Sequence, residues 1–239
     1  MLRGGPWEME VTPERGGRIT SLRLRGDELL EQGIGVDDPA ASDFVAGGAQ
    51  GWDEMVPNLE AVGSLPDHGE AWQVPWVVEE ESASSLLMSC RGRVVPFLFQ
   101  RRVSVGERVR AEYSYTNAGT GAHLAYWCAH PLFKFESGMS IGVPDGERLA
   151  ELSPGRSTKV FLPAGSVDRV RLGWRSGAAI ELVWDAGSTP DVAVWVCNGD
   201  LGGYRQIAIE PAIASTVLAP GESLEWWMEV RDFREGDGL

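Results

Sequence analysis

The sequence predicts an all-β protein that folds as one large sandwich or barrel of short antiparallel strands. Apolar residues recur with a period of two in several segments, turn residues follow at short intervals, and helical periodicity is weak throughout. Many short strands with regularly spaced turns are typical of sandwiches and barrels. No Ser-rich or Pro-rich linker and no internal repeat divides the 239 residues, so we expect a single domain over residues 1–239.

Five segments carry the strand signal. Alternating apolar and polar residues predict half-buried strands at Arg18–Leu24, Arg102–Tyr115 and Arg169–Trp174. Val192–Cys197 and Ile207–Glu210 are almost continuous runs of β-type residues, as in strands that are covered on both faces.

Turn residues separate these strands at many points. The clearest turns are Gly16-Gly17, Asn117-Ala118-Gly119, Pro144-Asp145-Gly146, Pro154-Gly155 and Pro220-Gly221.

Composition and charge narrow the class of partner. Hydrophobic residues make up 43% of the chain and charged residues 23%, which is ordinary for a globular protein. The formal net charge of −14 repels phosphate groups and anionic lipid, so we expect neither a nucleic acid partner nor a membrane partner. The one basic pair, Arg101-Arg102, lies in a strand-like segment, and we expect it to face solvent.

Cysteine usage and the N-terminal residues indicate a cytoplasmic protein. Cys90, Cys128 and Cys197 are far apart and form no CxxC pair, which favours free thiols in a reducing compartment over disulfides or a zinc site. The first residues include no apolar segment of the signal-peptide type, and no apolar run reaches the length of about 20 residues that a membrane helix needs.

The chain has only three histidines, so each context can be considered separately. His68 lies in a loop bounded by Pro and Gly, His130 lies between apolar residues at a strand end, and His123 has no distinctive neighbours. Glu210 closes an apolar strand directly before Pro211. Taken singly, each has an ordinary structural explanation: a core imidazole bonded to backbone for His130, a turn brace for His68 and a solvated carboxylate for Glu210.

Taken together, a histidine and a glutamate at the ends of apolar strands suit a reaction that donates one proton and removes another. Histidine titrates near neutral pH, and a carboxylate shielded by apolar neighbours is a competent base. We therefore regard Glu210 and His130 as a candidate pair that converges on one pocket.

Several short motifs stand in an order that resembles the aldose 1-epimerase (galactose mutarotase) superfamily. The resemblance extends from about residue 16 to about residue 230, and its specificity lies in the ordered set. The motifs are Gly16–Leu22, Gly51–Asn58, Leu65–Trp72 with Trp76, Tyr113–Gly119, His130–Phe133, Ile209–Pro211 and Leu218–Glu222.

This resemblance implies an antiparallel β-supersandwich and an enzyme that interconverts the anomers of free aldoses. By motif, Glu210 would take the proton of the anomeric hydroxyl, His130 would protonate the ring oxygen, and His68 would bind near that oxygen. The chemistry needs no metal or other cofactor, because only protons move. The implied partner is a small-molecule sugar, and the implied assembly is a monomer or a homodimer.

The resemblance also implies a set of sugar-binding residues, with two departures from the family pattern. Leu59 follows Asn58 where the family usually has Arg, and Trp72 stands where the hexose-6-phosphate branch has Arg. Because Arg is the usual bidentate partner of phosphate, an unphosphorylated sugar is favoured. The expected sugar contacts are Asn58, Trp52, Asp53, Glu70 and Trp72, with Glu54, Trp76 and Asp200 as further candidates.

Two other functions stay open at the level of sequence. The missing Arg residues and the abundant Trp also suit a non-catalytic carbohydrate-binding protein on the same scaffold. A sugar hydrolase or lyase has less support. A lyase of polyuronides needs a basic cleft, and this chain is strongly acidic.

Overall fold

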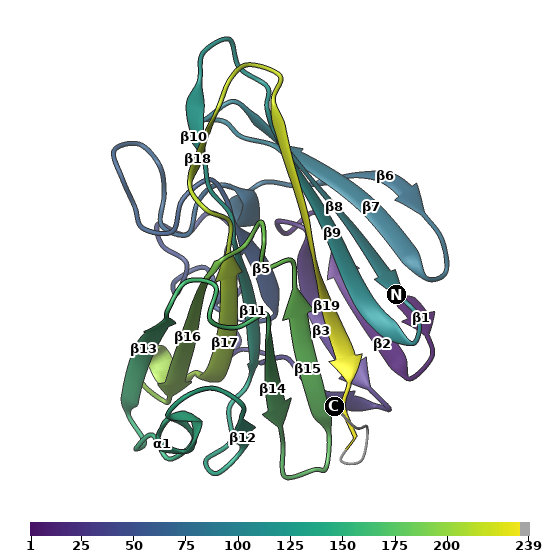
Figure 1. Cartoon of the computed structure of the whole chain (residues 1–239), viewed down its shortest axis with the longest axis vertical. Helices are drawn as coiled ribbons and strands as arrows, with labels where there is room; N and C mark the ends of the chain where they lie inside the picture. Colours follow the sequence, from purple (N-terminus) through teal and green to yellow (C-terminus); the bar gives the residue numbers. More distant parts are fainter. Residues whose placement is uncertain (235–239) are drawn as a thin grey trace.

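The computed structural model describes residues 1–234 and consists mainly of two large antiparallel β-sheets (Figure 1). The first sheet has nine strands in the order β1-β2-β3-β5-β11-β17-β16-β13, with β4 paired to β3. Its strands are β1 (Leu2–Gly4), β2 (Trp7–Thr12), β3 (Arg18–Leu24), β4 (Asp27–Glu28), β5 (Trp52–Met55), β11 (Cys128–Lys134), β13 (Arg156–Leu162), β16 (Asp191–Asn198) and β17 (Arg205–Ala212).

The second sheet has eight strands in the order β12-β14-β15-β19-β9-β8-β7-β6, and a separate two-stranded ribbon, β10-β18, stands at the top of Figure 1. Within residues 1–234 the helical elements are α1 (Gly146–Ala150) and 3-10 turns at Ala71–Gln73 and Leu201–Gly203. The strands are β6 (Val77–Glu81), β7 (Ser85–Arg91), β8 (Phe97–Val105), β9 (Arg108–Asn117), β10 (His123–Ala125), β12 (Ser140–Ile141), β14 (Arg169–Gly173), β15 (Ala179–Trp184), β18 (Thr216–Leu218) and β19 (Ser223–Asp232).

These elements confirm the prediction of an all-β antiparallel fold. The expected strand at Arg18–Leu24 is β3, and the expected segment Arg102–Tyr115 contains the end of β8, a tight turn and most of β9. None of the helices among residues 1–234 is long and apolar enough to cross a membrane.

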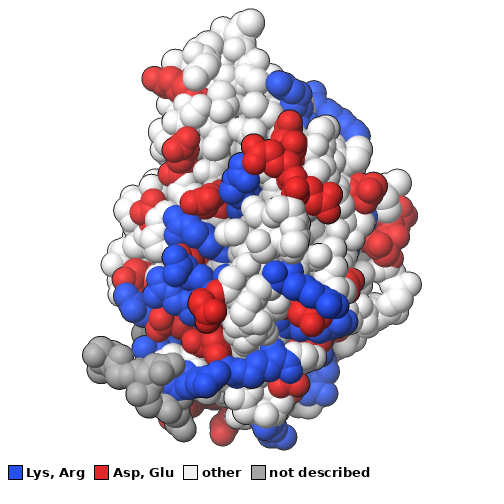
Figure 2. Space-filling view, turned by 90° about the vertical axis from the view of Figure 1, so that its right-hand side faces the viewer, with Lys and Arg blue, Asp and Glu red and all other residues white. Residues whose placement is uncertain are grey.

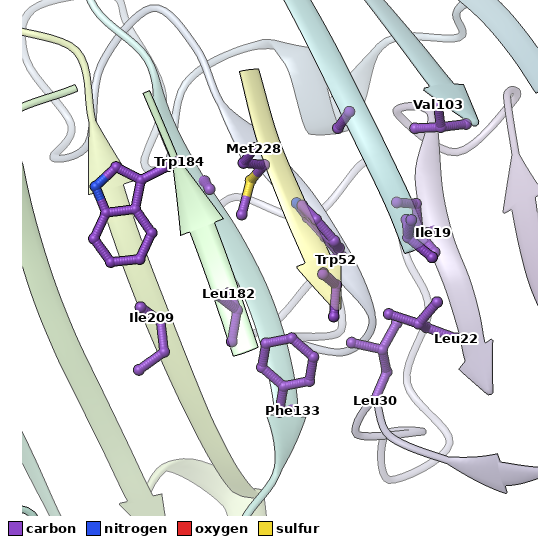
Figure 3. Packing of buried hydrophobic residues seen from close by; sticks show 14 of the residues in the cluster. Ile19, Leu22, Leu30, Trp52, Val103, Phe133, Leu182, Trp184, Ile209 and Met228 are labelled. Atoms are coloured by element: carbon purple, nitrogen blue, oxygen red, sulfur yellow. The ribbon is translucent and has the colours of Figure 1, made fainter. Parts of the chain in front are cut away.

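The main hydrophobic core fills the space between the two sheets (Figure 3). Ile209 of β17 and Phe133 of β11 lie there with Leu182 and Trp184 of β15. Successive side chains of a strand point to opposite faces. An inward Ile209 therefore turns the next residue, Glu210, to the outer face of the nine-stranded sheet.

That outer face carries a second, smaller apolar cluster. Residues from the loop after β4 and from the 3-10 turn that follows β5 pack over β11, β16 and β17. This cover explains why both β16 and β17 are buried on both faces, as their near-continuous apolar sequences predict. The cluster consists of Phe44, Ala49, Trp72, Leu132, Cys197, Tyr204 and Ala208.

One expectation about charge is wrong. Arg102 is half-exposed and pairs with Glu80, but Arg101 is fully buried and its Nη1 lies 2.8 Å from Glu54 Oε1. Adjacent strand residues face opposite ways, so the pair cannot be solvated as a unit. Elsewhere on the surface, acidic and basic side chains are interspersed, as the face in Figure 2 shows.

Candidate active site

Neighbouring strands bring a histidine and a glutamate together on the outer face of the nine-stranded sheet. The register of β11 and β17 places His130 beside Glu210, and His130 Nε2 lies 3.8 Å from Glu210 Oε1. Both residues are buried, with exposures of 5% and 2%. The two side chains thus share one site although 80 positions separate them in the sequence (210 minus 130).

A cavity of about 260 Å³ lies in front of this pair. Aromatic and aliphatic side chains form much of its wall, and carboxylates, imidazoles and one ammonium group face it. The lining residues are Phe44, Val45, Ala49, Leu59, Glu60, Asp67, His68, His130, Lys159, Phe161, Trp195, Leu201, Gln206 and Glu210.

Lys159 is a site residue that the sequence reasoning missed. Its Nζ lies 2.5 Å from Glu210 Oε2, and its side chain reaches there from β13, across β16. Burial raises the pKa of Glu210, and the Lys159 ammonium opposes this rise by stabilising the carboxylate. A lysine in an edge strand looks like an ordinary solvent-facing residue, so only the strand order could have identified it.

His130 is held in its neutral form. Burial lowers its pKa well below the usual value, and the nearby His68, Lys159 and Arg18 lower it further. Its Nδ1 makes no hydrogen bond to any described residue. The ordinary explanation of a core imidazole with both nitrogens bonded to backbone therefore does not describe His130.

The loop before the first 3-10 turn places His68 against the same cavity. His68 has a left-handed backbone (φ 60°) and precedes Gly69, which is also left-handed (φ 75°). The His68 ring stacks on Phe44, with centroids 4.5 Å apart, and lies 5.1 Å from the His130 ring. Its Nδ1 is 2.9 Å from Asp67 Oδ2, and this partner lowers the pKa of Asp67.

Two of the expected sugar contacts belong to β5 and lie outside the cavity lining. Trp52 points into the core between the sheets and is 1% exposed (Figure 3). Asp53 is opposite His130 in the strand register but is buried against Arg18, whose Nη2 lies 2.8 Å from Asp53 Oδ2. Direct contact with a sugar does not fit either position.

The other three expected contacts lie outside the cavity lining and hold loops in place. Asn58 donates hydrogen bonds to two backbone carbonyls of its own loop. Glu70 accepts hydrogen bonds from the backbone N–H groups of residues 93–95. Trp72 lies edge-on to Phe44, with centroids 5.4 Å apart, and is 1% exposed. Asn58 and Trp72 therefore support residues that line the cavity, whereas Glu70 fixes the turn between β7 and β8.

The further candidates are also away from the lining. Glu54 and Trp76 face the space between the sheets, and Asp200 accepts a hydrogen bond from Ser157. His123 lies on β10, with its Nε2 3.0 Å from the Tyr115 hydroxyl. Among residues 1–234, no group of three or more His, Cys, Asp and Glu side chains is arranged to hold a metal ion.

Comparison with solved structures identifies the fold. A candidate aldose 1-epimerase from Escherichia coli K12 is 18% identical, with a TM-score of 0.76 over 96% of this chain and 97% of that chain. A galactose mutarotase-like protein from Lactobacillus casei is 14% identical, with a TM-score of 0.74 over 96% of this chain and 98% of that chain. A galactose mutarotase related enzyme from Lactobacillus acidophilus is 12% identical, with a TM-score of 0.74 over 100% and 98%.

The chain therefore has the galactose mutarotase-like fold, as its motifs suggested. No protein-family model matches the sequence, and no curated protein matches it either.

Proposed function

We propose that this chain is an isomerase of the aldose 1-epimerase type, which interconverts the anomers of a neutral aldose. One observation carries the proposal: buried His130 and Glu210, 3.8 Å apart, both face a cavity of about 260 Å³. Pockets for drug-sized ligands start at roughly 300 Å³, so this cavity suits a ligand of monosaccharide size.

The pair supplies the two proton transfers that anomer exchange needs. Glu210 takes the proton from the anomeric hydroxyl while His130 gives a proton to the ring oxygen, and the bond between C1 and the ring oxygen breaks. The open-chain aldehyde rotates about its C1–C2 bond. Ring closure on the other face then returns both protons, so the cycle consumes nothing.

Burial disfavours the charged form of each group, since it raises the pKa of Glu210 and lowers that of His130. The cycle needs Glu210 as the carboxylate and His130 as the imidazolium. The Lys159 ammonium favours the first of these because it stabilises the Glu210 carboxylate. Proton transfer to the sugar therefore draws on the minority of molecules in which His130 carries a proton.

The charges around the cavity favour a neutral sugar. Among residues 1–234, its lining includes three carboxylates, Glu60, Asp67 and Glu210, against the single ammonium of Lys159, and no arginine. Leu59, which replaces the Arg usual in the family, forms part of the wall. A phosphate group would meet net negative charge here and no bidentate partner.

Polarimetry on freshly dissolved single anomers of common aldoses tests the proposal. We expect optical rotation to relax faster with the protein than in buffer alone for at least one sugar. An unchanged relaxation rate for every sugar of the panel would contradict the proposed activity.

The second candidate function is non-catalytic carbohydrate binding. The short contact between Lys159 Nζ and Glu210 Oε2 favours it, since an ion-paired carboxylate is a weaker base. In that case sugar binding would persist in Glu210→Gln and His130→Asn, and the parent protein would show no turnover.

A further inference from the structure

A second cavity adjoins the candidate active site on the other side of the Lys159–Glu210 ion pair. Its volume is about 270 Å³, close to the 260 Å³ of the first. Leu59, Phe161 and the ion pair itself line both cavities and form their common wall. The outer face of the sheet therefore carries two adjacent hollows of nearly equal size.

The second cavity has the mixed chemistry of a sugar subsite. Ala193 and Ala212 contribute an apolar floor from β16 and β17, and Tyr126, Asp191 and Ser215 add polar groups. The Asp191 carboxylate is exposed and makes no hydrogen bond or ion pair with the described residues. A free carboxylate beside apolar surface is suited to accept hydroxyl hydrogen bonds while a pyranose lays its C–H groups on the floor.

Phe161 stands where the two cavities meet. It is 72% exposed on the edge strand β13, and Lys159 Nζ lies 5.9 Å from its ring centroid. An aromatic face open to solvent at this point offers a stacking surface to a ligand that continues from one hollow into the other.

We propose that the two adjacent cavities together bind two linked rings, with a reducing sugar in the first cavity and a second sugar ring in the other. The preferred ligand is then a reducing disaccharide rather than a monosaccharide. This inference rests on the proposed function for the position of the reducing ring. The second subsite itself is assigned from the shared wall, the free carboxylate and the exposed aromatic ring.

Titration calorimetry with reducing disaccharides of different linkage, beside their component monosaccharides, tests this inference. The exposed Ser215 lines only the second cavity, so Ser215→Trp fills that space. Ala214→Trp is the matched control, because Ala214 is exposed and outside the lining. For the parent we expect one disaccharide to bind about tenfold more tightly than its monosaccharide. Ser215→Trp should reduce this ratio to about twofold or less, and Ala214→Trp should preserve it.

The outcomes separate this inference from the proposed function. Monosaccharide binding without a gain for any disaccharide would overturn the second subsite and leave the proposed function intact. A disaccharide gain that survives Ser215→Trp would overturn it as well. Failure of both sugar classes to bind would overturn both proposals.

Discussion

The two faces of the nine-stranded sheet each bury a glutamate, and the two carboxylates have opposite surroundings. Glu54 of β5 lies on the inner face, between the sheets. Arg101 Nη1 (2.8 Å), the Tyr113 hydroxyl (3.2 Å) and Trp127 Nε1 (2.7 Å) all donate hydrogen bonds to it. Its oxygens are shared among three fixed donors in a closed core.

Glu210 of β17 lies on the outer face and has one close partner among the described residues, Lys159, at 2.5 Å. His130 Nε2, at 3.8 Å, is beyond hydrogen-bond distance, and a cavity opens in front of both. Burial raises the pKa of Glu54 and of Glu210 alike. Desolvation is therefore common to both glutamates, and what distinguishes Glu210 is an oxygen that stays available to a ligand.

The largest effect that this comparison predicts is on catalysis. Glu210→Gln removes the proposed base, and the rate of anomer exchange should fall by about 10³-fold, within the usual range for general base catalysis. Stability should not fall, because the variant removes a buried charge and Lys159 is partly exposed to water. Nuclear magnetic resonance (NMR) exchange spectroscopy and thermal unfolding measure the two quantities. Retained exchange would show that Glu210 is as structural as Glu54.

On the inner face, loss of the cation that pairs with Glu54 should have a large effect on stability. Arg101→Met leaves the Glu54 carboxylate buried without its cation, which typically costs about 3–5 kcal/mol. The pKa of Glu54 then rises further. The loss of stability should therefore be small at acid pH, where the carboxyl is protonated in both the folded and the unfolded state, and should grow as pH rises toward the raised folded pKa.

Urea unfolding at about pH 5 and about pH 8 measures this loss. Arg102→Met is the matched control, since half-exposed Arg102 pairs only at the surface and should cost less than about 1 kcal/mol. Equal losses for the two variants would contradict the account of Glu54 as a buried carboxylate that depends on its Arg101 partner.

The next largest effect is expected from removal of the proposed acid, His130. His130→Asn should reduce the exchange rate by about a hundredfold, and it should abolish the limb of the pH–rate profile that reflects the imidazole. His123→Asn, on the separate ribbon, serves as the control and should leave both unchanged. An unaltered pH–rate profile in His130→Asn would exclude His130 as the proton donor.

The smallest effect concerns Lys159. Lys159→Met removes the ammonium that opposes the raised pKa of Glu210, so that pKa should rise and move the acidic limb of the pH–rate profile upward. The rate on that limb should fall about tenfold, and the rate above it should stay nearly unchanged. An unmoved acidic limb would mean that Lys159 does not control the ionisation of Glu210.

Sequence periodicity predicts the strands here because side chains alternate between the two faces of a strand, and this alternation depends only on neighbouring residues. The apolar run Ile207–Glu210 indicates a strand covered on both faces, and β17 is one. The ordered motifs also place His68, His130 and Glu210 in a common site, and all three line one cavity.

Which side chains face the cavity was harder to predict, since this depends on loop paths and strand order. Trp52 and Glu54 belong to Gly51–Asn58, a motif that resembles a sugar-pocket loop of the family, yet both face the core. Lys159 joins the site only because β13 lies beyond β16 in the sheet. Neither fact follows from residue type or spacing along the chain.

The most direct test of the proposed site is to locate the bound sugar on the protein. The chain has only three histidines, so isotope-labelled imidazole resonances can be assigned by single substitutions and followed by NMR as sugar is added. We predict that the His130 and His68 resonances shift and saturate together while His123 stays fixed. Sugar binding that leaves both His130 and His68 unmoved would contradict the central claim that the cavity lined by His130 and Glu210 is the site.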